Sequence, residues 1–185
     1  MIRVGLVTTI ATLSLLAAAC GSSEPNEITL YLKRDIGSSA PPGQIAPVLA
    51  PTVRRVASKS PSPAHALALL QEGPTKTEED EGFLPTVPSS VDILGVQVDD
   101  GTATVDFGGS EPQAFYTHAA IVLSLTELPG IKAVALRYNR GPCCVYTLDG
   151  NVITAPITRQ LYHGWPGEPC ALRTYPDAVK CRSDA

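Results

Sequence analysis

Long apolar segments are scarce in this chain. Residues 4–19 carry no charge, but this stretch is shorter than the roughly 20 residues that a helix needs to cross about 30 Å of hydrocarbon, and no later segment approaches that length. We therefore expect no membrane-spanning helix once the beginning of the chain has been processed.

Clustered positive charge is also lacking. The 185 residues include 14 lysines and arginines against 18 aspartates and glutamates, a net charge of −4 at pH 7, and no block of basic residues occurs. Proteins that bind nucleic acids neutralise phosphates with grouped basic side chains. This composition therefore argues against a nucleic-acid partner.

Residues suited to nucleophilic catalysis are few. The chain has 3 histidines, His65, His118 and His163, and none belongs to a recognisable nucleophile elbow. A nucleophile needs an oriented base beside it. We therefore predict no catalytic residues, and we expect His118 to be half-buried on a helix and His65 to be exposed.

Metal-binding patterns are absent as well. The adjacent Cys143 and Cys144 would point to opposite faces of a strand, whereas cysteines that share a zinc ion are usually separated by two to four residues. The acidic run Glu78–Glu81 lacks the alternating ligands and the glycine of a calcium loop, so we expect a solvated loop there. No metal and no cofactor are predicted.

The beginning of the chain has the order of an exported protein. Arg3 precedes the apolar stretch, and the alanines of residues 17–19 lead directly into Cys20, as in a secretory signal peptide. A cysteine at this place resembles the bacterial lipobox, although alanine stands three positions before it, where leucine is commoner. The resemblance implies that residues 1–19 are removed, that Cys20 carries acyl chains such as palmitate, and that residues 20–27 tether the domain to the membrane.

The other cysteines, Cys143, Cys144, Cys170 and Cys181, lie in the last quarter of the chain. An even number of cysteines in an exported chain favours disulfides. A bond between two adjacent cysteines would be strained. We therefore expect Cys143 and Cys144 each to pair with one of the two later cysteines, in either order.

The first part of the domain has clear signals for strands and a helix. The pattern predicts, in order, a strand over 28–33, irregular chain over 36–51, an edge strand over 52–57 whose arginines face water, and a helix over 64–71. Ser62 and Pro63 before this helix and Gly73 after it supply the start and stop signals.

The second part begins with a predicted hairpin, because Asp100-Gly101 favours a tight turn. A capping box starting at Ser110 then precedes a second helix. The pattern predicts strands over 91–98, 102–107, 131–138 and 143–148, a turn over 139–142, and one apolar helix face formed by Ala114, His118, Ile121, Val122, Leu125 and Leu128.

Five stretches in this order resemble the GerMN domain: Ile28–Leu32, Ala66–Pro74, Leu84–Pro88, Ile93–Phe107 and Ile121–Val134. This module belongs to sporulation and spore-germination proteins and also occurs in actinobacterial envelope lipoproteins. The resemblance implies an α+β fold, in which a mixed or antiparallel sheet is packed by two helices within residues 28–161, followed by a cysteine-containing tail over 162–185. It also implies a role in envelope assembly or signalling, without catalytic residues.

Aromatic and arginine side chains gather near the cysteine-rich end. The partner-binding candidates are Arg137, Tyr138, Arg140, Tyr146, Arg159, Tyr162 and Trp165. Tyrosine, tryptophan and arginine are enriched among the residues that dominate binding at interfaces, so we interpret this group as a binding surface. The alternative is that these side chains pack the tail onto the sheet.

The resulting hypothesis is a non-catalytic binding or scaffolding module, anchored by lipid at the extracytoplasmic face of the cell membrane. Its partner would be an envelope protein or cell-wall material. The alternative is a small envelope hydrolase that acts on peptidoglycan. Activity against purified cell wall that disappears when one histidine or acidic residue is replaced would favour the hydrolase.

Replacing the lipid-bearing side chain tests the anchor. Cys20→Ala should abolish lipid labelling and release the protein from the membrane fraction, because the thiol is the attachment point. Cell fractionation and labelling with a tagged fatty acid measure both effects. Ser22→Ala, two positions away, should keep the lipid, and membrane retention of the Cys20→Ala variant would contradict the anchor.

Overall fold

The computed structural model of the chain describes residues 27–37, 47–57, 60–109, 115–143, 145 and 153–162. Several sequence-based predictions lie outside these residues: the signal peptide, the lipid-bearing Cys20, the helix cap at Ser110, most of the strand predicted over 143–148, and the tail beyond Tyr162. They stay predictions.

The described residues form two sheets and two longer helices. The elements are β1 (Glu27–Arg34), β2 (Val48–Arg55), α1 (Pro63–Glu72), α2 (Lys76–Asp80), β3 (Phe83–Leu84), β4 (Val91–Asp99), β5 (Thr102–Gly109), α3 (Phe115–Leu125), β6 (Ala133–Tyr138), β7 (Gly141–Pro142) and the 3₁₀ turn η2 (Arg159–Tyr162). The strand orders are β2-β1-β3 and β4-β5-β6-β7. The predicted α+β class is confirmed, but two sheets stand where one was expected.

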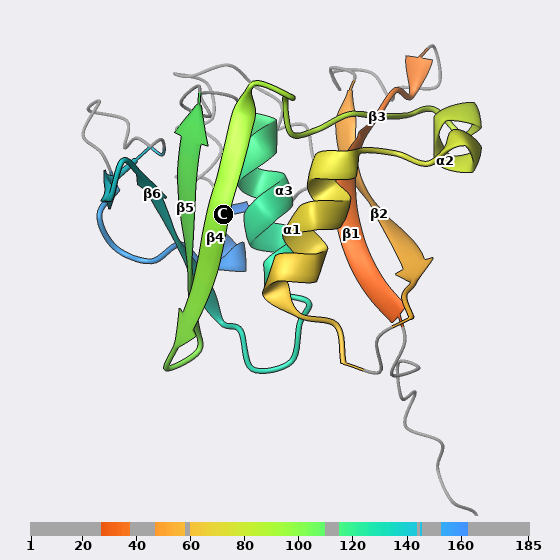
Figure 1. The fold of residues 1–185 in the computed structure, drawn as a ribbon. Coiled ribbons are helices and arrows are strands. Elements are labelled where there is room, and N and C mark those ends of the chain that lie inside the picture. The colour runs from red at the N-terminus through yellow and green to blue at the C-terminus, as the bar shows by residue number, and fades with distance from the viewer. Residues whose placement is uncertain are drawn as a thin grey trace, which may run out of the picture.

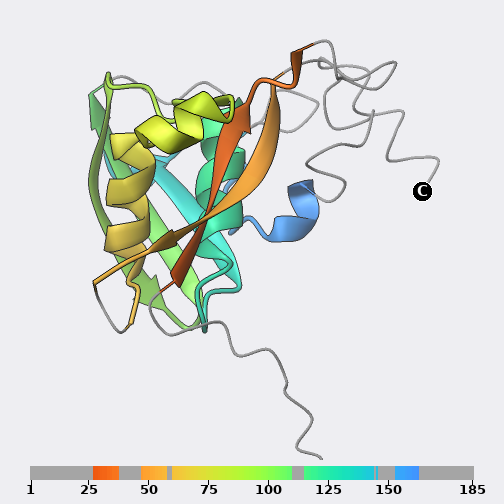
Figure 2. The ribbon, with the colours of Figure 1, turned by 90° about the vertical axis from the view of Figure 1, so that its right-hand side faces the viewer.

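Helices α1 and α3 lie between the two sheets (Figure 1). Figure 2 looks onto the sheet that contains β1 and β2, with α3 behind it. No helix within the described ranges has both the length and the apolar composition to cross a bilayer.

The β4–β5 hairpin forms as predicted. Asp99 pairs with Thr102, so Asp100 and Gly101 form the turn, with φ of 43° and 76°. A two-residue turn of this kind requires positive φ at both positions, which glycine adopts freely and aspartate tolerates. The chain then passes from β5 through α3 into β6, which pairs with β5 in parallel.

Helix α1 begins and ends where its capping residues predict. The Ser62 side chain accepts a hydrogen bond from the His65 backbone N–H at 3.2 Å, and Pro63 occupies the first turn. Gly73, with φ of 78°, ends the helix. One face of α1, formed by Ala66, Leu67 and Leu70, is buried.

The prediction of a single apolar face on α3 is wrong. Thr117, His118 and Ser124 are as inaccessible as Ile121 and Leu125, all with 0 to 3% of their surface exposed. The reason is that α3 contacts β1 on one side, β6 on the other, and α1 as well, so every residue from Thr117 to Leu125 is buried. His118 is therefore fully buried rather than half-buried.

Polar side chains of α3 find their partners inside the core. Ser124 Oγ accepts a hydrogen bond from the Tyr31 backbone N–H at 2.9 Å, at a part of β1 that β3 does not pair. Thr117 Oγ1 donates to the Thr86 carbonyl at 2.9 Å, and Thr86 Oγ1 accepts from the Lys33 backbone N–H at 2.7 Å. A buried donor left without a partner costs about 1–3 kcal/mol, so these hydroxyls favour one placement of β1 against α3.

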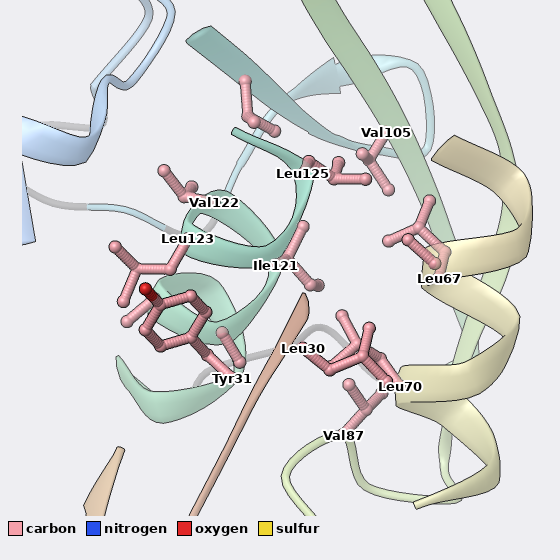
Figure 3. Close-up of a cluster of buried hydrophobic side chains, with 14 of the residues drawn as sticks. Leu30, Tyr31, Leu67, Leu70, Val87, Val105, Ile121, Val122, Leu123 and Leu125 are labelled. Carbon is pink, nitrogen blue, oxygen red and sulfur yellow. The ribbon is translucent and has the colours of Figure 1, made fainter. Parts of the chain in front are cut away.

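The hydrophobic core joins all these layers. Figure 3 shows Leu30 of β1, Leu67 of α1, Val105 of β5 and Ile121 of α3 gathered around one interior. These side chains belong to one buried cluster. Burial of apolar surface at about 25 cal/mol per Å² is the main favourable contribution to folding.

Strand β2 is longer than predicted, because it covers Val48–Arg55 rather than 52–57. Proline favoured irregular chain in this region, yet Pro51 lies within the strand opposite Tyr31. The position tolerates proline because β2 is at the edge of its sheet, where a residue without an N–H need not break the ladder.

Two charged residues that were expected to face water form a buried ion pair instead. Arg54 of β2 and Glu78 of α2 have side chains only 10% and 9% exposed, and Arg54 Nη2 lies 2.5 Å from Glu78 Oε2. Arg54 also donates to the Gly73 carbonyl at 2.7 Å, and Glu78 Oε1 accepts from Thr52 Oγ1 at 2.8 Å. Arg55, the other arginine of the strand, is exposed as predicted.

The acidic run Glu78–Glu81, predicted to be a solvated loop, instead belongs largely to the short helix α2 (Lys76–Asp80). Thr75 and Glu78 form a capping box, in which each side chain accepts a hydrogen bond from the other residue's backbone N–H. The run is acidic, but its first glutamate points inward to Arg54, which a count of charges along the chain does not reveal.

The contacts of Glu78 determine its ionisation. Burial by itself would raise the pKa of the carboxyl group, but hydrogen bonds from Arg54, from the Thr75 backbone and from Thr52 lower the pKa to about 2, from an ordinary value of 4.5. Because the folded pKa lies below the unfolded one, the ionised pair stabilises the protein above about pH 4.5, and this contribution is lost as the pH falls toward about 2.

Acid titration of a Glu78→Gln variant tests this pair. The variant should be less stable than the parent near neutral pH, and the difference in unfolding free energy should shrink by about 3 kcal/mol between about pH 5 and pH 2. Denaturant unfolding across this range measures it. Glu79→Gln, at an exposed neighbouring position, should show no such trend; a Glu78→Gln difference that does not change with pH would contradict the assignment.

Truncation of a core leucine tests the enclosure of α3. Leu125→Ala should lower the free energy of unfolding by about 2–5 kcal/mol, because it leaves a cavity between the sheets. Leu94→Ala, at an exposed leucine, should change it by no more than about 0.5 kcal/mol. Thermal or denaturant unfolding distinguishes the two, and a loss below about 1 kcal/mol for Leu125→Ala would show that α3 is not a core helix.

Candidate functional site

The four-stranded sheet has one face against the helices and one face away from them. Ala103, Val105 and Phe107 of β5 are buried on the helix side. The residues between them point to the other side, which we call the outer face. The register places Gln97 beside Thr104, Gly95 beside Asp106, and Asp106 beside Arg137 on this face.

Strand β4 carries an irregularity that shapes the outer face. The register shifts between Ile93 and Gly95, so Leu94 is an extra residue in the strand, as in a β-bulge. Its side chain is 68% exposed and lies over Gly108, where an added Cβ would come within 3.1 Å of Leu94 Cδ2. The bulge thus turns a large apolar side chain toward solvent.

A hollow of about 470 Å³ lies beside Leu94. Its lining comprises Leu94, Gly95, Val96 and Gln97 of β4, Asp106 and Phe107 of β5, and Asn139 and Arg140 of the turn after β6. A Cβ added to Gly95 would have no atom within 4 Å, so the space above this residue is open. The volume falls within the range of pockets that hold small ligands, about 300–1,000 Å³.

The turn that borders the hollow has an unusual residue at its second position. Tyr138 pairs with Gly141, leaving Asn139 and Arg140 as the turn, with φ of 49° and 66°. Such turns favour asparagine followed by glycine, because both positions need positive φ. Arginine at the second position is strained, and strained residues in folded proteins concentrate at functional sites.

Arg137 and Arg140 have different roles in this turn. Arg137 Nε donates to the Arg140 carbonyl at 3.1 Å and lies 3.6 Å from Asp106 Oδ1, so its charge is already engaged. The Arg140 guanidinium is exposed and has no hydrogen bond or ion pair with any residue that the structure describes. It is therefore a cation available to a ligand.

A second hollow, of about 270 Å³, adjoins the first on β6. It is lined by Thr104, Ala135, Leu136, Arg137, Arg140, Pro142, Cys143, Ile153, Thr154, Ala155 and Ile157. Arg140 lines both hollows, so this residue lies where they meet.

The predicted partner-binding residues do not form one surface. Arg137, Tyr138 and Arg140 come together at the β6–β7 turn, where the Tyr138 hydroxyl donates to the Gly109 carbonyl at 2.9 Å. Tyr162 is instead buried in the core, which raises the pKa of its hydroxyl. Tyr146 and Trp165 lie outside the described residues.

Arg159 holds η2 against the end of α3. It forms an ion pair with Glu127 at 2.6 Å, and it donates to the Leu123 carbonyl at 3.2 Å and to the Tyr31 hydroxyl at 3.0 Å. Leu123 belongs to the last turn of the helix, where carbonyls lack helical partners and positive charge is favourable. These contacts assign Arg159 a packing role, which was the alternative interpretation of the aromatic and arginine group.

The described residues contain no group of three or more metal-ligand side chains. Cys143 is buried and has a bonding partner, whereas Cys144, Cys170 and Cys181 lie outside the described residues, so the predicted disulfide pairing stays a prediction. His65, predicted to be exposed, is partly buried.

Leu94, Gly95 and Asp106 were not among the candidates from sequence. One local signal was present, because an isolated glycine inside a strand pattern, here Gly95, suggests a bulge. The exposure of Leu94 depends on which residue the bulge displaces, and that is decided by pairing with β5 rather than by the sequence of β4 alone.

The fold with this geometry is that of GerMN domains. Tandem GerMN domains of the sporulation protein GerM from Bacillus subtilis align with 77% of this chain at 22% identity and a TM-score of 0.56. The first GerMN domain of the same protein aligns with 72% of this chain at 20% identity and a TM-score of 0.54. The chain covers 49% of the tandem structure and 98% of the single domain, so it spans about half the length of the tandem relative.

The family model Germane, described as sporulation and spore germination, matches residues 29–142, which is more than half of the chain. The chain therefore belongs to this family. The match runs from β1 to β7 and confirms the resemblance that the sequence motifs indicated. No curated protein is similar enough to match.

Relief of the strained turn provides a test of Arg140. Arg140→Gly should leave the free energy of unfolding unchanged or raise it by up to about 1 kcal/mol, because glycine removes the left-handed strain but adds entropy to the unfolded chain. Arg140→Ala keeps the Cβ and should show no gain. Denaturant unfolding compares them, and a loss above about 1 kcal/mol for Arg140→Gly would mean that the guanidinium stabilises the fold.

Proposed function

We propose that this chain is a non-catalytic binding module of the bacterial cell envelope, held outside the membrane by lipid on Cys20. A partner protein binds the outer face of its four-stranded sheet. The observation that carries the proposal is the placement of an uncommitted cation, Arg140, at the junction of two hollows beside the exposed Leu94.

Membership of the sporulation and spore germination family and the lipobox-like sequence around Cys20 support the envelope setting. The composition of the outer face supports the binding role. Binding surfaces combine exposed apolar side chains with arginine, and the interaction energy is concentrated in a few such residues. Arg159, by contrast, bonds to Leu123 and Tyr31 of the domain, and Tyr162 is buried.

Site-specific crosslinking in cells that produce the full chain tests the proposal. A photo-crosslinking residue at Gln97, on the outer face, should capture one partner protein that mass spectrometry identifies in repeated experiments. The photo-crosslinking residue placed instead at Val53, which is 57% exposed on the other sheet, should not capture this partner. Arg140→Ala should reduce capture at Gln97 by about tenfold or more, as expected for loss of a central charged contact.

Equal capture from both positions, or capture at Gln97 that Arg140→Ala does not change, would contradict the outer face as the binding site. Incubation with purified cell wall provides a separate check on the absence of catalysis. Cleavage of peptidoglycan that is lost on replacing His65 or His118 would favour the hydrolase over the binding module.

A further inference from the structure

We infer that the outer face recognises an acidic segment of its partner, in which a carboxylate side chain binds Arg140 and a neighbouring aliphatic side chain packs on Leu94. This inference rests on the proposed function and adds the chemistry of the bound segment. It depends on the charge at the two hollows, the shape of the first one, and the backbone of the β6–β7 turn.

The charge at the hollows favours an anion. Asp106, Arg137 and Arg140 are the charged residues among the described lining. Arg137 faces Asp106 and offsets its charge, so the cation of Arg140 remains. The whole chain carries a net charge of −4, and charge complementarity favours an anionic group of the partner beside this exposed cation.

A carboxylate suits this site better than a phosphate. Arginine binds both anions through paired N–H donors. Asp106 lines the same hollow, and its Oδ1 atom is buried and has no hydrogen-bond partner among the described groups. Because the ion pair with Arg137 offsets this carboxylate, Arg140 supplies one net positive charge among the described lining residues, which a singly charged carboxylate neutralises and a doubly charged phosphate exceeds.

The shape of the hollow accommodates a side chain beside the anion. Leu94 provides an apolar surface on one side, and Gly95 leaves the floor without a Cβ. An aliphatic side chain next to the carboxylate would cover Leu94 and remove its surface from water. Recognition thus needs two groups in adjacent places, which a short peptide segment provides.

The turn keeps Arg140 in place before a ligand arrives. Arg137 donates from Nε and Nη2 to the Arg140 carbonyl, and this holds the backbone of the turn although its φ of 66° is unfavourable for arginine. A side chain whose backbone is already positioned loses less entropy on binding. Glycine would suit the turn better, and strained residues of this kind cluster at ligand-binding sites.

Titration of the ¹⁵N-labelled full chain with two peptides tests the inference. The first peptide is a capped hexapeptide of alternating leucine and glutamate, and the second has glutamine in place of each glutamate. The glutamate peptide should cause saturable shifts of the Gly95, Gln97 and Arg140 amide signals. The glutamine peptide should bind about tenfold more weakly or not at all, as the loss of a charge-assisted contact predicts.

Two variants and one matched control localise the binding. Arg140→Gln should weaken the glutamate peptide by about tenfold. Arg55→Gln removes the same charge from an arginine that is 82% exposed on the other sheet, and it should leave the affinity unchanged. Gly95→Leu should block binding by filling the open floor of the hollow, while thermal unfolding shows that the domain remains folded.

Other outcomes would overturn the inference. Equal binding of the two peptides would show that carboxylate is not recognised, and equal losses in the arginine variants would show a general charge effect. Displacement of the peptide by inorganic phosphate at lower concentration would indicate a phosphate site instead. If crosslinking at Gln97 succeeds and the peptides fail, the binding module stands without this acidic ligand; failure of both removes the proposed function as well.

Discussion

The enclosure of α3 between two sheets is the constraint on which the rest of the structure depends. A helix with no side open to water must satisfy its polar side chains internally, because burying an unpaired polar group is unfavourable. The bond between Ser124 and the Tyr31 N–H therefore positions β1, and the bond between Thr117 and Thr86 positions the segment that leads to β4. The outer face of the four-stranded sheet does not have to satisfy polar groups of the core, and it is there that the exposed Leu94 lies near Arg140, whose guanidinium has no partner among the described residues.

The parts of the fold that local chemistry specifies were predictable from the sequence. The Asp100-Gly101 turn and the caps of α1 depend on residues only a few positions apart, and both formed as expected. The Arg54–Glu78 pair depends on two residues 24 positions apart that local patterns treat as solvent-facing. The burial of α3 on all sides could not be predicted either, since a second sheet covers the side that periodicity left polar.

The candidate site also has a part that the sequence indicated and a part that only the structure shows. Composition singled out Arg137, Tyr138 and Arg140 because arginine and tyrosine suit binding surfaces, and the turn brings all three together. It grouped them with Arg159, which in space contacts β1 and α3 instead. The opposite half of the hollow, from Leu94 to Gln97, comes from a strand more than 40 residues earlier, and only the register with β5 shows that the two halves face each other.

The bond from Tyr31 to Ser124 joins residues 93 positions apart, and the bond from Arg159 to Tyr31 joins residues 128 positions apart. A side chain of β1, the first strand of the domain, is thus bonded to a residue of η2, which lies at the end of the described residues. Contacts this distant along the chain slow folding, because the entropy of closing a long loop is lost before the contact can stabilise the fold. The β4–β5 hairpin, whose turn is formed by the adjacent residues Asp100 and Gly101, closes a far shorter loop than either of these two bonds.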